Sequence, residues 1–366
     1  MERRKVGILG ATGMVGQRFI QLLSNHPWFE ITWLAASDRS SGKRYDEACR
    51  WKLDTPLPTK IAAMTLMPSL PDGTPATDLP RIIFAALDAQ HAHDLEPRFA
   101  AAGCAVISNS SAFRMTSDVP LVVPEVNADH LALIEGQSWR KSSGGYIVTN
   151  PNCCAIGLVL ALAPIHAAFG IESLFITTLQ AVSGAGYPGV ASLDIFGNVI
   201  PFIKNEEEKL QEEVGKLLGQ LAPVDQPDHV AMMDVNLSAH CNRVAVIDGH
   251  TECVSIKLKK PATHEQMLAA WANFKPLQGI HEGHALPSAP AQPVEYEEAI
   301  DRPQPRLDLM RGNGMATTVG RLRPCSIFDW KFTLLTHNTI RGAAGAAILN
   351  AEILAMLGKL DWKASA

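Results

Sequence analysis

The sequence predicts an α/β protein of two domains: a doubly wound parallel sheet first, then an α+β domain with a mostly antiparallel sheet. Strand-like and helix-like segments alternate through roughly the first 150 residues, as in a parallel sheet covered on both faces. Later segments alternate polar and apolar residues with period two, which is typical of antiparallel strands with one covered face. The length of 366 residues also exceeds what one hydrophobic core usually supports.

The composition is that of an ordinary globular protein, with 47% hydrophobic and 19% charged residues. A net charge of −5 gives no electrostatic argument for a nucleic-acid or membrane-surface partner. The seven cysteines are an odd number without paired spacing, so we expect no metal site, no disulfide framework and a cytoplasmic location. No uncharged run approaches the 20 or so apolar residues of a membrane-spanning helix.

The chain begins with a strand, a glycine-rich turn and a helix. Lys5–Leu9 is apolar enough for a buried strand, and an apolar helical pattern follows. Gly10, Gly13 and Gly16 form a variant of the dinucleotide-binding fingerprint, which needs a tight turn, close approach to pyrophosphate and close helix–strand packing. The first domain is therefore predicted to be of Rossmann type. The predicted cofactor-binding residues of this turn are Gly10, Thr12, Gly13, Met14 and Val15.

A polar turn follows the second predicted strand, Glu30–Ala36, where a Rossmann-type domain meets the adenosine ribose. Four of its side chains offer hydroxyl or cationic donors suited to a 2′-phosphate, which favours NADP: Ser37, Arg39, Ser40 and Lys43. Asp38 is the kind of carboxylate that an NAD enzyme uses, so NAD stays an alternative, as does a merely solvated turn.

Two further strands are predicted at Arg81–Leu87 and Ala105–Ser108, with a helix over Ala89–Ala102 between them. Arg114 follows the second of these strands at its carboxyl end, where open α/β sheets bind ligands. It is a candidate for gripping a phosphate or carboxylate, and a solvated loop arginine is the alternative. A further helix is expected to begin near Ala128.

A thiol stands where a long apolar helix begins. Tyr146–Val148 reads as a buried strand, Asn152 as a helix cap, and Ala155–Phe169 as a helix packed on both sides. Cys153 then falls in the first helical turn, where free backbone N–H groups and the helix dipole favour a thiolate. The alternative is that Cys153 and Cys154 are small core residues, because free cysteine is among the most buried residue types.

The second half of the chain supplies further strands and two helices. Strands are predicted at Leu174–Gln180, Val244–Ile247, Glu252–Lys259, Ala316–Leu322 and Phe328–Leu335, and helices over Glu206–Leu218 and Thr339–Leu357. The small residues that open the last helix permit close packing, which we expect to be against the first domain.

A nicotinamide cofactor together with an activated cysteine restricts the reaction. Attack of a thiol on a carbonyl gives a thiohemiacetal, its attack on an acyl phosphate gives a thioester, and hydride transfer connects the two. The class is therefore an aldehyde dehydrogenase or an acyl reductase, which also needs a proton shuttle. Among the twelve histidines, His250 is best placed because it follows a predicted strand at a turn, although a generic histidine there lies at the surface.

Three separated motifs together resemble aspartate-β-semialdehyde dehydrogenase, in the branch shared by archaea, fungi and some bacteria: Gly10–Gly16, Asn150–Cys153 and Asn242–Thr251. The resemblance covers nearly the whole chain. It implies a homodimer or homotetramer in which NADPH reduces L-4-aspartyl phosphate to aspartate semialdehyde, releasing phosphate, on the route to lysine, threonine and methionine. We expect residues 1–150, completed by a C-terminal helix at 338–366, to bind NADP, and residues 151–337 to form a catalytic and dimerisation domain.

The resemblance also implies roles for single residues. Cys153 matches the nucleophile and His250 the acid/base. The substrate positions match Arg243 for the α-carboxylate, Glu206 for the amino group, Arg114 and Lys209 for phosphate, and Gln180 for orienting the intermediate. Ser183, Gly184 and Asn338 match positions near the nicotinamide. Cys154 departs from the family, which more often has serine or threonine there, so the sequence leaves open which thiol reacts.

Three alternatives compete. Malonyl-CoA reductase resembles this chain and uses the same cysteine chemistry, but it has less need for Glu206, which matches an amino-group contact. N-acetylglutamyl-phosphate reductase carries glycine where Asn152 stands. A non-catalytic NADP-binding sensor with the same fold would have no need to keep the cysteine, histidine, arginines, lysine and glutamate.

Overall fold

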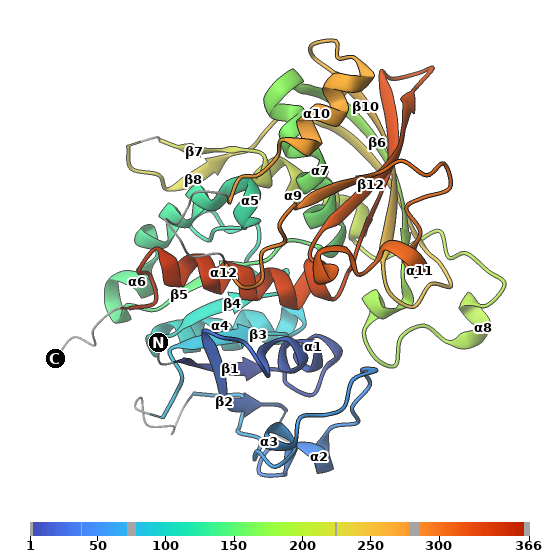
Figure 1. The fold of residues 1–366 in the computed structure, drawn as a ribbon. Helices are drawn as coiled ribbons and strands as arrows, with labels where there is room; N and C mark the ends of the chain where they lie inside the picture. The colour runs from blue at the N-terminus through green and yellow to red at the C-terminus, as the bar shows by residue number, and fades with distance from the viewer. Residues whose placement is uncertain (1–2, 38, 72–77, 224, 278–285, 362–366) are drawn as a thin grey trace.

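The computed structural model describes residues 3–37, 39–71, 78–223, 225–277 and 286–361. The first sheet is parallel and has five strands, as predicted (Figure 1). Their order is β2 (Phe29–Ala35), β1 (Arg4–Leu9), β3 (Ile82–Ala85), β4 (Ala105–Ser108) and β5 (Tyr146–Thr149). Within the described ranges, no helix is long and apolar enough to cross a membrane.

Helices cover both faces of this sheet, which makes it doubly wound. On one face, α1 (Met14–Leu23) and the closing helix α12 (Gly345–Met356) share an apolar core with β1, β3 and β4. On the other face, α4 (Ala89–Ala101) packs Leu95 and Phe99 against the alternate residues of the same strands. The last helix of the chain is thus part of the core around the first sheet.

Shorter helices connect these elements: α2 (Tyr45–Ala48), α3 (Thr59–Ala62), α5 (Pro124–Asn127), the 3₁₀ helix η1 (Ala128–Gly136) and α6 (Ser138–Ser143). The helix expected near Ala128 begins earlier, because Pro124 occupies the first helical position, where its missing N–H costs nothing. From Ala128 onward the segment is 3₁₀ rather than α.

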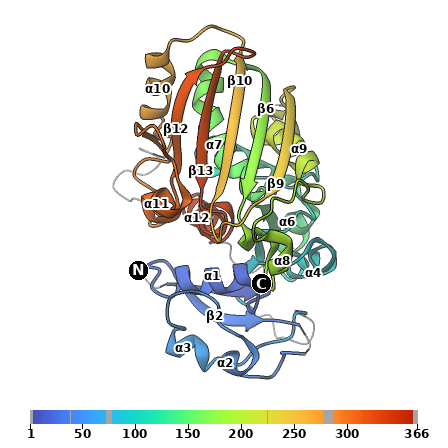
Figure 2. The ribbon, with the colours of Figure 1, turned by 90° about the vertical axis from the view of Figure 1, so that its right-hand side faces the viewer.

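The second sheet is mixed and has six strands, ordered β11 (Val294–Glu297), β12 (Thr317–Pro324), β13 (Trp330–Thr336), β10 (His250–Leu258), β6 (Ile171–Gln180) and β9 (Asn236–Arg243). Its central pairings are antiparallel, as the alternating pattern predicted. The edge strands β11 and β9 instead run parallel to their neighbours. Figure 2 looks onto the long strands of this sheet, with the first domain below it.

One face of the second sheet is covered and the other is open. The long helix α7 (Cys153–Phe169) packs on the covered face together with α9 (Glu206–Leu217) and α10 (His264–Ala272). The open face carries polar side chains and the exposed ring of Phe175. Helix α7 begins directly after β5, so it joins the end of the first sheet to the core of the second domain.

One strand prediction was wrong. Residues 244–247 are outside any strand, and the strand β9 ends just before them at Arg243. Ile247 is 77% exposed, because this apolar run follows the sheet edge as a loop instead of entering the core. The remaining elements are β7 (Gln220–Ala222), β8 (His229–Ala231), α8 (Ser192–Ile195), α11 (Pro305–Asp308), the 3₁₀ helices η2 (Val182–Ala185) and η3 (Arg311–Gly314), and the π-helix η4 (Ile340–Ala344).

Candidate active site

A cavity of about 590 Å³ lies where the glycine turn, the start of α7 and the carboxyl end of β6 meet. It gathers most of the residues that the sequence singled out: Gly13, Met14, Val15, Arg114, Cys153, Gln180, Ser183, Gly184, Glu206, Lys209, Arg243 and Asn338. Gly10, Thr12, Ser37, Arg39, Ser40, Lys43 and His250 do not line it. The candidate nucleophile and the five candidate substrate residues therefore converge on one hollow between the two sheets, and His250 is not part of its lining.

Cys153 is the first residue of α7, as the sequence predicted. The Asn152 side-chain oxygen caps the helix by accepting from the N–H groups of Cys154, at 2.8 Å, and Ala155, at 3.4 Å. Gly342 lies against Cys153 so closely that an added Cβ would stand 2.8 Å from the cysteine Cβ. This position of the chain therefore needs glycine for a packing reason.

The thiols of Cys153 and Cys154 and a ring nitrogen of His250 all lie within 4.8 Å of one another. The pKa of Cys153 is held well below its ordinary value, chiefly because Cys154 donates a hydrogen bond to its sulfur; His250 and Arg114 lower it further, and burial opposes them. Burial and the bond to Cys153 raise the pKa of Cys154. Cys153 is thus the thiolate of the pair and Cys154 the thiol.

The imidazole of His250 is wholly buried and its orientation is fixed. Its Nδ1 accepts a hydrogen bond from the backbone N–H of Ala181 at 3.1 Å. A neutral ring in this position carries its proton on Nε2, which has no hydrogen-bond partner among the described residues. A protonated Nε2 has no free lone pair with which to bind a metal ion. In metal-bound histidines the other ring nitrogen donates its N–H, whereas Nδ1 of His250 accepts a hydrogen bond. The Cys153–Cys154–His250 cluster is therefore arranged to give a proton rather than to bind a cation.

Glu206 and Arg243 place opposite charges at the cavity. One carboxylate oxygen of Glu206 accepts from Asn152 Nδ2 at 2.8 Å and from Gln180 Nε2 at 3.1 Å. Arg243 donates from Nη1 to the Ala181 carbonyl at 2.8 Å. Both side chains are less than a tenth exposed, so their remaining donor and acceptor capacity faces the cavity.

A carboxylate that the sequence did not reveal holds Arg114. Glu213 accepts from Arg114 Nη1 at 2.8 Å with one oxygen and from the backbone N–H of Asn152 at 2.5 Å with the other. Arg114 also donates to the Asn109 carbonyl at 2.8 Å, while its buried Nε has no partner within the described ranges. Lys209, one turn before Glu213 on α9, lines the same cavity. Glu206, Lys209 and Glu213 of α9, which composition alone would leave to solvent, thus belong to the site, whereas Glu208 and Glu212 of the same helix are exposed.

Asn338 joins the loop after β6 to the turn before β10. Its side-chain oxygen accepts from the backbone N–H of Gly249 at 2.8 Å, and its side-chain nitrogen donates to Ser183 Oγ at 2.8 Å. Ser183 and Gly184 are in η2, and an added Cβ at Gly184 would stand 3.2 Å from His250 Nε2. These residues therefore form the part of the wall beside the histidine.

The glycine turn has the geometry that the fingerprint requires. Gly10 has a φ of +82°, and an added Cβ there would stand 2.5 Å from the Ala86 carbonyl oxygen. An added Cβ at Gly16 would stand 2.3 Å from the Gly10 carbonyl oxygen, so α1 packs closely on β1 only with glycine. Gly13 caps α1 without a side-chain hydrogen bond, which leaves N–H groups of the first turn free for an anion.

The polar turn after β2 lies outside the cavity. Ser37, Arg39 and Lys43 are exposed, and Ser40 is half-buried. The turn is closed by the Ser37 carbonyl, which accepts from the backbone N–H groups of Ser40 at 2.8 Å and Ser41 at 3.2 Å. Asp38 lies outside the described residues. This is the free donor-rich surface that a 2′-phosphate needs.

Several lining residues were not among the predicted site residues: Ala86, Leu87, Asp88, Ala89, Asn109, Ser110, Ser111, Asn152, Ile203, Lys204, Thr339, Gly342 and Ala343. Ala86–Ala89 follow β3 at its carboxyl end, so the rule that pointed to Arg114 after β4 applies to them as well. The sequence carried no such signal for Ile203 or Gly342.

Comparison with known proteins places the chain in a family. The family model described as semialdehyde dehydrogenase, NAD binding domain, matches residues 5–134, and that described as semialdehyde dehydrogenase, dimerisation domain, matches residues 162–341. Aspartate-semialdehyde dehydrogenase of Archaeoglobus fulgidus is 48% identical over 352 residues, 96% of this chain and 98% of that protein. The Saccharomyces cerevisiae enzyme is 42% identical over 366 residues, 96% of this chain and 98% of its own.

Solved structures agree with these sequence matches. The crystal structure of aspartate semialdehyde dehydrogenase with NADP from Candida albicans superposes with a TM-score of 0.86 at 42% identity, covering 96% of this chain and 99% of that one. Aspartate semialdehyde dehydrogenase II of Vibrio cholerae, complexed with ASA, gives a TM-score of 0.73 at 26% identity, covering 97% and 99%. Fold, cavity and sequence lead to the same conclusion: the chain belongs to the aspartate-semialdehyde dehydrogenase family.

Proposed function

We propose that this chain catalyses the NADPH-dependent reductive dephosphorylation of L-4-aspartyl phosphate to L-aspartate 4-semialdehyde through a thioester on Cys153. The observation that carries the proposal is one cavity with a stabilised thiolate, a carboxylate and two buried guanidinium groups. Glu206 is suited to the substrate amino group and Arg243 to its α-carboxylate, since a planar guanidinium binds a carboxylate with two parallel bonds. Malonyl-CoA, the substrate of the competing enzyme, carries a carboxylate but no amino group, so it would leave Glu206 without a substrate group to bind.

The cofactor fits the glycine turn. The free N–H groups at the start of α1 suit the pyrophosphate, and the side chains of Ser37, Arg39, Ser40 and Lys43 suit a 2′-phosphate. Ser183, Gly184 and Asn338 would stand beside the nicotinamide. The chemistry that bound NADPH supplies is hydride donation to the thioester carbon.

The remaining steps belong to the chain itself. The Cys153 sulfur attacks the acyl carbon, the C–O bond to phosphate breaks, and phosphate leaves toward Arg114 and Lys209. Asn152 already uses the N–H groups of Cys154 and Ala155, so the N–H of Cys153 is the donor at the helix start for the oxyanion. Reduction leaves the thiohemiacetal as its oxyanion; the C=O bond of the aldehyde then re-forms as the C–S bond breaks, and His250 Nε2–H stabilises the departing thiolate.

The test is an assay in the oxidative direction. Aspartate semialdehyde with NADP and phosphate should give phosphate-dependent formation of NADPH, and malonyl-CoA with NADPH should give none. Activity only with malonyl-CoA would identify the chain as a malonyl-CoA reductase. Binding of NADP without turnover in either assay would identify a non-catalytic sensor.

The division of labour and the assembly are also proposals. Residues 1–150 with the closing helix would hold NADP, and residues 151–337 would carry the substrate and pair with a second copy in a homodimer or homotetramer, an assembly that the dimerisation-domain match supports. All seven cysteines are free thiols, which supports work in the reducing cytoplasm.

A further inference from the structure

A buried ion pair stands behind the nucleophile and has no part in the chemistry described above. Arg341 donates from Nη1 and Nη2 to the two carboxylate oxygens of Glu125, at 2.8 and 2.7 Å. The two side chains are 0% and 1% exposed. The pair joins α5 to the segment that precedes α12.

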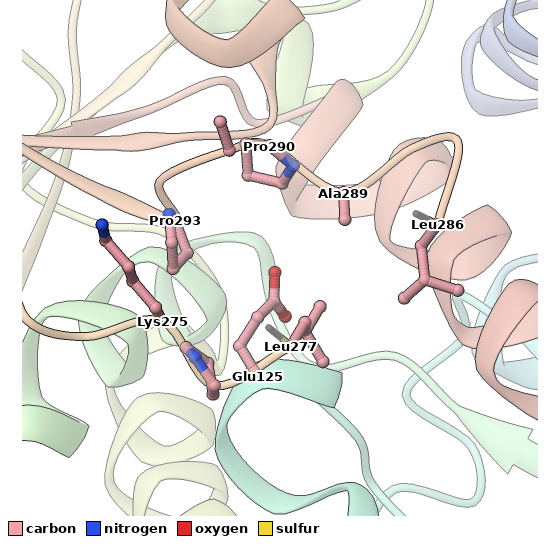
Figure 3. Close-up of a pocket in the computed structure, with 9 residues that line it drawn as sticks. Glu125, Lys275, Leu277, Leu286, Ala289, Pro290 and Pro293 are labelled. Carbon is pink, nitrogen blue, oxygen red and sulfur yellow. The ribbon is translucent and has the colours of Figure 1, made fainter. Parts of the chain in front are cut away.

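Apart from Arg341, Glu125 faces a second cavity whose lining is mostly apolar and includes one further charged residue, Lys275. Figure 3 shows its carboxylate beside Leu277, Pro290 and Pro293, at the edge of this cavity. In such surroundings a carboxylate depends on its ion partner, because removing one charge leaves the other buried and uncompensated. The bidentate geometry also fixes the direction of the Arg341 side chain.

Arg341 belongs to the π-helix η4, and the residue after it touches the nucleophile. An added Cβ on Gly342 would stand 2.8 Å from Cys153 Cβ and 3.1 Å from Cys153 Cα. Gly342 and Ala343 line the active-site cavity, and Thr339, just before η4, lines it too. A π-turn is a strained departure from the α-helix and is frequent at functional sites, so it needs neighbours that hold it.

We propose that the Arg341–Glu125 pair is a positioning device that holds η4 against Cys153 and thereby keeps the sulfur beside Cys154 and His250. The pair anchors the outer side of η4, and Gly342 transmits its position to the cysteine on the inner side. Arg341 and Glu125 are positioning residues, since neither lines the active-site cavity. The test by kcat rests on the proposed function, whereas the test by the alkylation rate of Cys153 is independent of it.

Two variants separate positioning from folding. R341K keeps the positive charge but loses the bidentate hydrogen bonding to Glu125. The double variant E125L/R341M replaces the pair by apolar side chains, a change that often leaves stability unaltered. R302K is the matched control, because Arg302 is paired with buried Asp308 away from the cavity. All are compared by kcat, by KM for phosphate, by melting temperature, and by the rate of Cys153 alkylation with iodoacetamide at pH 7.

We expect both Arg341 variants to fold, and their kcat to fall on the order of 10-fold or more because the sulfur is displaced. The alkylation of Cys153 should be slower in the same two variants, while their KM for phosphate stays near the wild-type value. R302K should match the wild type in all these measurements. Folded variants with wild-type kcat and alkylation rates would overturn the proposal. So would failure of both variants to fold, which would make the pair a folding element only. If the wild type shows no turnover while Cys153 alkylation is slower in the variants than in the wild type, only the proposed function is refuted.

Discussion

The charge state of Cys153 depends on a small number of neighbouring protons. The thiol of Cys154 and the Nε2–H of His250 lie close to the Cys153 sulfur, and the Arg114 guanidinium adds a positive charge that favours the thiolate. Glu252 is wholly buried close by, and neither of its carboxylate oxygens has a partner among the described residues. Burial raises the pKa of Glu252 well above its ordinary value, which favours the neutral form of this carboxyl beside the thiolate.

Substitution of Cys154 tests which thiol reacts. C153S should abolish turnover, whereas C154S should keep most of it because a hydroxyl still donates to the Cys153 sulfur. C154A removes the donor, so the pKa of Cys153 should rise and its alkylation at pH 7 should slow about 10-fold, as expected for a hydrogen bond to a charged group. Peptide mapping after iodoacetamide labelling measures this. Loss of turnover in C154S with full activity in C153S would reverse the assignment.

At the scale of elements, helix α4 carries a buried acid into the first sheet. Glu96 is 0% exposed, and one of its oxygens accepts from Ser108 Oγ on β4 at 2.6 Å. Its other oxygen has no partner within the described residues. Burial is the main cause that raises the pKa of Glu96, to about 7. The folded protein therefore keeps this proton at pH values where the unfolded chain has lost it.

E96Q removes this titration. Because the pKa of Glu96 is higher in the folded state, its proton stabilises the fold. This contribution is complete at pH values below 4.5, the pKa in the unfolded chain, and is lost as the pH rises through about 7. The free energy of unfolding of E96Q minus that of the wild type should thus increase across this window by roughly 2–4 kcal/mol. Urea unfolding at pH 5 and pH 7.5 measures it. A difference that stays constant or shrinks would show that Glu96 is ionised in the fold.

The elements with strong local signals were predictable. Gly10 and Gly16 marked a turn whose tight contacts only glycine allows, and Asn152 marked the start of α7 through its cap. Strand β9 was missed because its inward positions carry short or polar side chains, such as Ala239 and Arg243, instead of an apolar run.

Tertiary pairing hid part of the site from the sequence. Glu213 holds Arg114 across 99 residues of chain, and Gly342 meets Cys153 from the far end of the sequence. Local patterns carry no information on such contacts. The two-domain order and the site residues that follow strands were accessible because the carboxyl ends of parallel strands share one edge of the sheet.

At the scale of the whole molecule, large apolar side chains gather on the arm between β6 and α9. Leu193 is 93% exposed, Phe196 74% and Phe202 68%, which is unusual for a surface that faces water. The arm and the open face of the second sheet belong to the part of the chain that matches a dimerisation domain. We infer that a second copy covers them.

The double variant L193D/F196D tests this surface. Two buried carboxylates per copy should dissociate the assembly, because burying unpaired charge is costly. Light scattering should then give a monomer near 39.5 kDa, against at least twice that mass for the wild type. L357D is the control, since Leu357 is 51% exposed at the end of α12 on the first domain. An unchanged mass for the double variant would exclude the arm from the interface.

The most direct test of the account is to trap the acylated enzyme. The chain is incubated with aspartate semialdehyde and NADP without phosphate, quenched in acid, and digested for tandem mass spectrometry. An aspartyl thioester on Cys153, formed with one equivalent of NADPH and absent from C153S, is the predicted result. An aspartyl group on Cys154, or full turnover by C153S, would contradict the assignment of Cys153 as the nucleophile.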